Sequence, residues 1–130
     1  MEVALVRHDF SLRYVARVGS LASPLALTVA SLWAGFEGSL LFWTALLGGC
    51  AAVLAASTRR LGPRAQVATA VVCAVGVFFT ALLCGPAQAF AAQVPVPPDG
   101  LGAAPLLQNH WLMLVHPPTL YLGEVALTVP

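Results

Sequence analysis

The stretch SLLFWTALLGGCAAVLAAST, residues 39–58, decides the fold class of this chain, because it contains no charged side chain. A helix rises about 1.5 Å per residue, so a helix of this length matches a hydrocarbon core about 30 Å thick. Residues 67–87 form a second apolar run of the same kind. We therefore predict an all-α integral membrane protein with transmembrane helices at 39–58 and 67–87.

The composition supports this prediction. The chain of 130 residues is 59% hydrophobic and 8% charged, and it contains no lysine, whereas a soluble domain carries roughly a quarter charged residues. The few basic residues fall in two short clusters, which argues against a nucleic-acid partner. Cys50, Cys73 and Cys84 lack metal-finger spacing and are interpreted as apolar packing residues, with a disulfide to Cys84 left open.

The segment RRLGPR, residues 59–64, separates the two predicted spans. Its three arginines follow the positive-inside pattern, so we predict a cytoplasmic loop. Residues 1–38 and 88–111 then lie on the extracytoplasmic side. Arg7, Arg13 and Arg17 would also lie on that side, which is contrary to the positive-inside rule.

The N-terminal 38 residues are interpreted as an extracytoplasmic, interfacial segment. Residues 1–17 mix apolar and charged positions, which suits either an amphipathic surface helix or a juxtamembrane tail. Residues 18–36 are uncharged, but Pro24 and the spaced hydroxyl residues favour a surface or re-entrant segment over a third span.

Glu37 is the only charge between Arg17 and Arg59, and Trp33 lies four residues before it. A carboxylate at the edge of hydrocarbon is unfavourable unless it faces protein or a helix N-terminus. Two interpretations follow: a capped helix start with an aromatic belt, or a functional carboxylate.

Residues 88–111 are rich in Pro and Gly and predict a loop. From residue 112 to 130 the chain turns apolar, and we expect the start of a third span, broken at Pro117-Pro118. His116 precedes a proline, so it is expected at a helix start or break, with its ring facing a cavity. There it could ligate haem iron, donate to a propionate or cap the helix.

Gln108, Asn109, Trp111 and Tyr121 surround this position with amide groups and flat rings. Such a set suits a large planar ligand with carboxylate edges. It suits equally a loop that attaches itself to neighbouring helices.

Four stretches together carry a resemblance to a known family: DFSLRYVA (9–16), WAGFEGSLLFW (33–43), DGLGAAPLLQNHW (99–111) and HPPTLYLG (116–123). In this order they resemble CcmF-type haem lyases of c-type cytochrome biogenesis. The resemblance implies a multi-pass protein of the cytoplasmic membrane that receives haem from a haem chaperone. It implies further that haem is joined to apocytochrome c on the outer side, together with other maturation subunits.

The tryptophan-rich WWD segment of that family, with its haem-ligating histidines, is not among these residues. The resemblance therefore assigns no axial ligand here, and we expect a fragment of a multi-span cytochrome c assembly domain. Catalytic and metal-ligating residues are not assigned. The candidate haem- or partner-facing residues are Trp33, Glu37, Gln108, Asn109, Trp111, His116 and Tyr121.

The sequence thus predicts a haem-handling membrane subunit of c-type cytochrome maturation. The alternatives are a membrane scaffold or assembly subunit without haem chemistry, and an inactive gene remnant. A small transporter has Glu37 as its only support.

Overall fold

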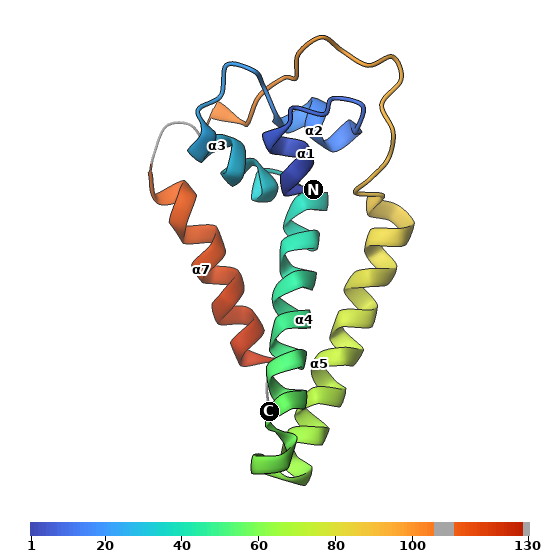
Figure 1. Ribbon diagram of the computed structural model, residues 1–130, viewed down its shortest axis with the longest axis vertical. Helices are drawn as coiled ribbons and strands as arrows, with labels where there is room; N and C mark the ends of the chain where they lie inside the picture. The colour runs from blue at the N-terminus through green and yellow to red at the C-terminus, as the bar shows by residue number, and fades with distance from the viewer. Residues whose placement is uncertain (106–110, 129–130) are drawn as a thin grey trace.

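The computed structural model describes residues 1–105 and 111–128, apart from the side chains of residues 58–61. The chain forms a helical stem with a head at one end (Figure 1). The head contains the short helices α1 (Glu2–Val6), α2 (Arg13–Val18), α3 (Leu25–Ala30) and the 3-10 turn η1 (Ser31–Trp33). The stem contains α4 (Phe36–Leu61), α5 (Pro63–Leu82) with its π-helical continuation η2 (Leu83–Ala87), and α7 (Leu112–Leu127).

The stem confirms the predicted membrane character. Two helices in the described residues are long and apolar enough to cross a bilayer: Phe36–Ser57, of 22 residues, and Pro63–Ala87, of 25 residues. Only 11% of each apolar window is buried inside the protein. Val53, Val77 and Phe78 are more than half exposed on these helices, so their surroundings must themselves be apolar.

The connection between the two spans is shorter than the predicted loop of residues 59–64. Helix α4 runs to Leu61, and α5 begins at Pro63, so Gly62 alone lies between them. Gly62 has φ +69°, a region that only glycine adopts readily, and Pro63 occupies the first turn of α5, where its missing N–H is not needed. These two residues turn the chain without a longer loop.

The N-terminal segment is neither one amphipathic helix nor an unpacked tail. His8, at φ +54°, separates α1 from α2. Residues 18–36 do not form a span, because α3 and η1 together cover only residues 25–33. The buried residues of the head form one apolar cluster: Leu5, Phe10, Tyr14, Val15, Ala16, Val18 and Leu32.

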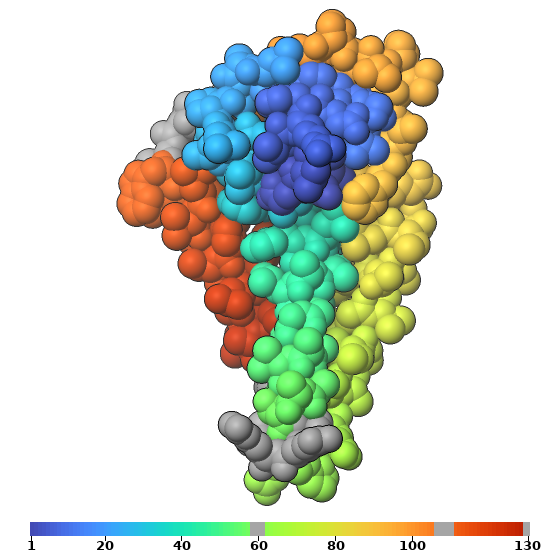
Figure 2. Space-filling model, viewed as in Figure 1, coloured from blue at the N-terminus to red at the C-terminus, as the bar shows by residue number. Residues whose placement is uncertain are grey.

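The loop after η2 returns across the head, where residues 1–35 and the orange loop form one continuous mass above the narrower stem (Figure 2). Main-chain hydrogen bonds hold it there. The N–H of Arg13 donates to the Ala91 carbonyl at 2.9 Å, and the N–H of Leu101 donates to the Ala16 carbonyl at 3.0 Å. A Cβ at Gly100 would meet the Gly19 carbonyl oxygen, so glycine is needed for this close approach.

Helix α7 crosses towards α4 from the opposite side to α5 (Figure 1). It continues through Pro117 and Pro118, so the break expected at these prolines is absent. A proline inside a helix leaves the carbonyl four residues earlier without its usual donor. For Pro117 that carbonyl belongs to Met113, and it finds a donor outside the helix, as described below.

Candidate functional site

The junction between head and stem is built around an ion pair. Arg17, in the last turn of α2, bonds the carboxylate of Glu37, in the first turn of α4. The side chain of Arg17 is 46% exposed and that of Glu37 17% exposed. The guanidinium also lies 5.4 Å from the ring centroid of Tyr14. Glu37 therefore has a charged partner within the protein.

The hydroxyl of Tyr14 joins α2 to η1 and to the turn that precedes α4. It lies 2.9 Å from the carbonyl oxygens of both Ser31 and Leu32, and it accepts the N–H of Gly35 at 3.1 Å. A side chain at Gly38 would collide with this hydroxyl. The buried tyrosine thus gives the turn between η1 and α4 its hydrogen-bond partners.

The surroundings of Tyr14 and Arg17 keep both side chains protonated. Burial raises the pKa of the Tyr14 hydroxyl well above its usual range. The hydrogen bond to Glu37 raises the pKa of the Arg17 guanidinium further above neutral. Tyr14 therefore stays neutral and Arg17 stays charged throughout the physiological pH range.

Two side-chain hydrogen bonds attach α7 to the junction. The indole N–H of Trp33 donates to the Met113 carbonyl at 3.2 Å. This is the carbonyl that Pro117 leaves without a backbone donor. The Tyr121 hydroxyl donates to the Ser39 hydroxyl at 3.2 Å. Neighbouring groups that satisfy freed carbonyls are the usual reason why proline is tolerated in membrane helices.

Aromatic rings fill the space between the three stem helices. Tyr121 stacks on Trp43 with centroids 5.4 Å apart, and Trp43 contacts Phe79 at 4.8 Å. Phe42 lies between Trp33, at 5.6 Å, and Tyr121, at 6.0 Å. We call these five residues, Trp33, Phe42, Trp43, Phe79 and Tyr121, the aromatic cluster. It links α4 to both α5 and α7.

The predicted site residues do not gather around one cavity. Trp33, Glu37 and Tyr121 are engaged inside the protein. His116 lies in the interior of α7, so the expected position at a helix start or break is wrong, and its side chain is exposed. Trp111 is 65% exposed. Gln108 and Asn109 lie outside the described residues.

The larger groove of the stem has no histidine in its lining. The groove between α4 and α7, of about 390 Å³, has an apolar lining without an imidazole: Ala45, Leu46, Gly49, Cys50, Val53, Leu122, Val125 and Ala126. No group of three His, Cys, Asp or Glu side chains in the described part of the chain is placed to hold a metal ion. What this part offers is aromatic surface and one exposed histidine.

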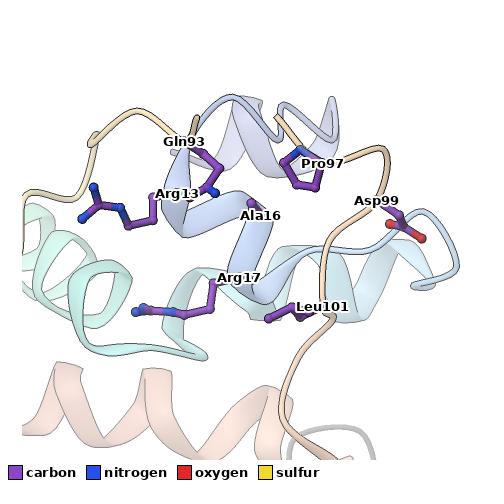
Figure 3. Close-up of a pocket in the computed structure, with 7 residues that line it drawn as sticks. All are labelled: Arg13, Ala16, Arg17, Gln93, Pro97, Asp99 and Leu101. Carbon is purple, nitrogen blue, oxygen red and sulfur yellow. The ribbon is translucent and has the colours of Figure 1, made fainter. Parts of the chain in front are cut away.

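A second cavity, of about 270 Å³, lies in the head between α2 and the returning loop (Figure 3). The guanidinium groups of Arg13 and Arg17 extend to the same side of α2, while Asp99 lies at the other end (Figure 3). The lining residues are Arg13, Ala16, Arg17, Gln93, Pro97, Asp99 and Leu101.

The sequence predictions missed Arg17 as the partner of Glu37, and Phe42 and Phe79 as parts of the aromatic cluster. The sequence did contain a signal for the Arg17–Glu37 pair, since Glu37 is the lone carboxylate beside an apolar run and needs a cation. No sequence signal pairs Phe79 with Trp43, because the two rings come from different helices.

Comparison with known proteins assigns the family. The chain is 36% identical over 129 residues to the cytochrome c-type biogenesis protein CcmF of Pseudomonas fluorescens, and the match covers 97% of this chain. It is 35% identical to CcmF of Escherichia coli and to the cytochrome c-type biogenesis protein CycK of Rhizobium meliloti, again over 97% of the chain. The chain belongs to the CcmF family of cytochrome c-type biogenesis proteins.

The chain spans about a fifth of the length of these relatives, 19% for the P. fluorescens protein and 20% for the E. coli protein. No family model matches the sequence. No solved structure matches it either. The identity to the CcmF relatives over 97% of the chain confirms, at the level of the CcmF family, the resemblance stated from the four motif stretches.

Proposed function

We propose that this chain is part of a haem-handling membrane subunit of c-type cytochrome maturation. The observation that supports it most directly is the identity to CcmF proteins over 97% of the chain. The proposed location is the cytoplasmic membrane, with the head on the extracytoplasmic side. The proposed partners are a haem chaperone, apocytochrome c and further maturation subunits.

Within this function we assign the exposed outer part of α7 to haem contact. Trp33, Glu37 and Tyr121 already have partners in the protein, so they hold the surface in place rather than meet the ligand. Of the described candidates, His116 and Trp111 are the ones with exposed side chains. The axial ligands of the haem iron are not assigned to this chain and come from other parts of the maturation system.

A chimera tests the proposal. The corresponding segment of a full-length CcmF relative is replaced by residues 1–130, and holocytochrome c is measured by haem staining in cells that lack the native gene. We expect maturation to be retained. Loss of maturation by a chimera that is present in the membrane at normal level would contradict the proposal.

Haem absorbance of the same chimera tests the assignment to α7. We expect His116→Ala to weaken or shift the Soret band. His8→Asn is the matched control, because it removes an imidazole from the head and asparagine tolerates the positive φ of this position. Equal spectra for wild type and His116→Ala would remove His116 from the site.

A scaffold without haem chemistry is the second candidate. It is favoured by the internal use of Trp33, Glu37 and Tyr121, whose polar atoms all bond protein groups. Under this alternative, His116→Ala and wild type mature cytochrome equally well, whereas a variant that breaks the Arg17–Glu37 pair does not.

A further inference from the structure

The length of the first span indicates where Arg13 would lie relative to a bilayer. The first span begins at Phe36, and its 22 residues cover about 33 Å at the usual helical rise, close to a hydrocarbon thickness of about 30 Å. Glu37, in its first turn, therefore marks the boundary. Arg17 bonds Glu37, and Arg13 lies one turn away on α2, with its guanidinium on the same side (Figure 3).

Arg13 and Arg17 share one carboxylate at this boundary, because both interact electrostatically with Glu37. Glu37 neutralises Arg17. The exposed guanidinium of Arg13 makes no ion pair or hydrogen bond within the part of the chain that the structure describes. The carboxylate of Asp99 accepts the N–H groups of Leu21, at 2.9 Å, and Gly100, at 2.7 Å, at the far end of the cavity. Two arginines and one carboxylate thus leave one positive charge in excess on this side of α2.

The lining beside Arg13 suits an anion with several oxygen acceptors. Gln93 contributes an amide group, whose nitrogen also donates to the Pro95 carbonyl at 3.5 Å, and Ala16 contributes an apolar contact. A guanidinium offers donors in a planar fork that matches two oxygens of a phosphate.

We propose that Arg13, together with Gln93, binds the phosphate group of a phosphate ester at the membrane boundary. Arg17 supports the site through its pair with Glu37. The same chemistry occurs in a phospholipid headgroup and in a soluble phosphate ester. The position of Arg13 beside the stem makes the headgroup the expected source. This site is independent of the proposed haem contact on α7.

Native mass spectrometry of the whole 130-residue chain in a neutral detergent tests the proposal. The chain is titrated with phosphatidylglycerol and, separately, with a diacylglycerol of the same acyl chains and with glycerol phosphate. We expect phosphatidylglycerol to bind, and Arg13→Gln to weaken its binding roughly fivefold, the usual effect of one arginine near a charged membrane surface. Diacylglycerol binding should not respond to this variant.

Arg7→Gln is the matched control, because Arg7 is an exposed arginine of the head outside the lining of the cavity. It should leave phosphatidylglycerol binding unchanged. Arg13→Lys, which keeps the charge and loses the fork, should fall between wild type and Arg13→Gln. Circular dichroism confirms that each variant is folded.

The outcomes separate the sources. Glycerol phosphate that binds as tightly as phosphatidylglycerol, and depends on Arg13, would support the phosphate site and assign it to a soluble ester. Equal weakening by Arg7→Gln and Arg13→Gln, or no effect of either, would overturn the proposal.

Discussion

Substitution of Trp33 by Phe tests how α7 is held against the head. The ring contact with Phe42 is largely kept, but the indole N–H that donates to the Met113 carbonyl is lost. Because Pro117 has no N–H, that carbonyl also lacks its usual donor four residues later. We expect the outer end of α7 to loosen while α4 and α5 stay paired.

The size of the effect follows from the hydrogen bond. Its length of 3.2 Å and half-buried position suggest an ordinary neutral bond, which contributes about 0.5–1.5 kcal/mol net. Interhelical bonds in membrane proteins average about 0.6 kcal/mol. We therefore expect Trp33→Phe to lower the free energy of unfolding by about 1 kcal/mol, including a small loss of ring contact.

A double-mutant cycle isolates the hydrogen bond from the ring contact. Pro117→Ala restores a backbone N–H four residues after Met113, which can bond the same carbonyl. In that background the effect of Trp33→Phe should shrink to the packing loss alone. The assay is reversible unfolding by sodium dodecyl sulfate in mixed micelles, followed by tryptophan fluorescence and circular dichroism.

Pro118→Ala is the matched control. It also replaces a proline of α7, but the carbonyl that it would satisfy belongs to Leu114, which Trp33 does not bond. Trp33→Phe should keep its full effect in this background. Equal coupling of Trp33 to Pro117 and to Pro118, or no coupling to either, would refute the reasoning.

Three further predictions concern the junction and the loop. Glu37→Gln should lower the free energy of unfolding by roughly 0.5–1 kcal/mol, as expected for a half-exposed pair, and the same cycle with Arg17→Gln should show coupling that weakens in high salt. Gly38→Ala should destabilise by about 1–3 kcal/mol through overpacking, whereas Gly48→Ala, at a position with open space around it, should be neutral or stabilising in the same unfolding assay. The N–H of Leu21 holds the pKa of Asp99 below its usual value. The support that Asp99 gives the loop is therefore complete above the unfolded pKa of about 3.9 and is lost as pH falls through the lower folded pKa. Hydrogen exchange of residues 93–102 should accelerate in this acid range, and Asp99→Asn should abolish that pH dependence.

The stem could be predicted from the sequence because its signal is local. A charge-free run such as 39–58 has one stable form in a bilayer, a helix whose backbone groups all bond within the segment. The ends of these helices were less predictable. The predicted loop of six residues is a turn at Gly62, because the positive φ of this residue lets the chain reverse direction there. Composition alone does not indicate such a tight turn.

The head and the candidate site could be predicted only in part, because their contacts join residues far apart in the sequence. His116 illustrates the limit. A residue before proline is usually pushed out of the helical region, which predicts a break. The helix nevertheless continues, and Trp33, 80 residues before Met113, donates to the carbonyl that Pro117 leaves without its usual donor. A local rule cannot include a donor from another segment.

The motif stretches that carry the family resemblance meet in one place. Tyr14, from the first stretch, bonds the N–H of Gly35, from the second. Trp33, also from the second, bonds the turn of α7 just before the last stretch. Gly100, from the third, packs against the backbone that follows α2. These segments thus fix the position of the head on the stem, and this explains why most of their polar groups already have partners. Under the proposed function, haem contact belongs to exposed side chains of the same stretches, so a variant such as His116→Ala should alter haem contact without altering the free energy of unfolding, whereas Trp33→Phe should alter both.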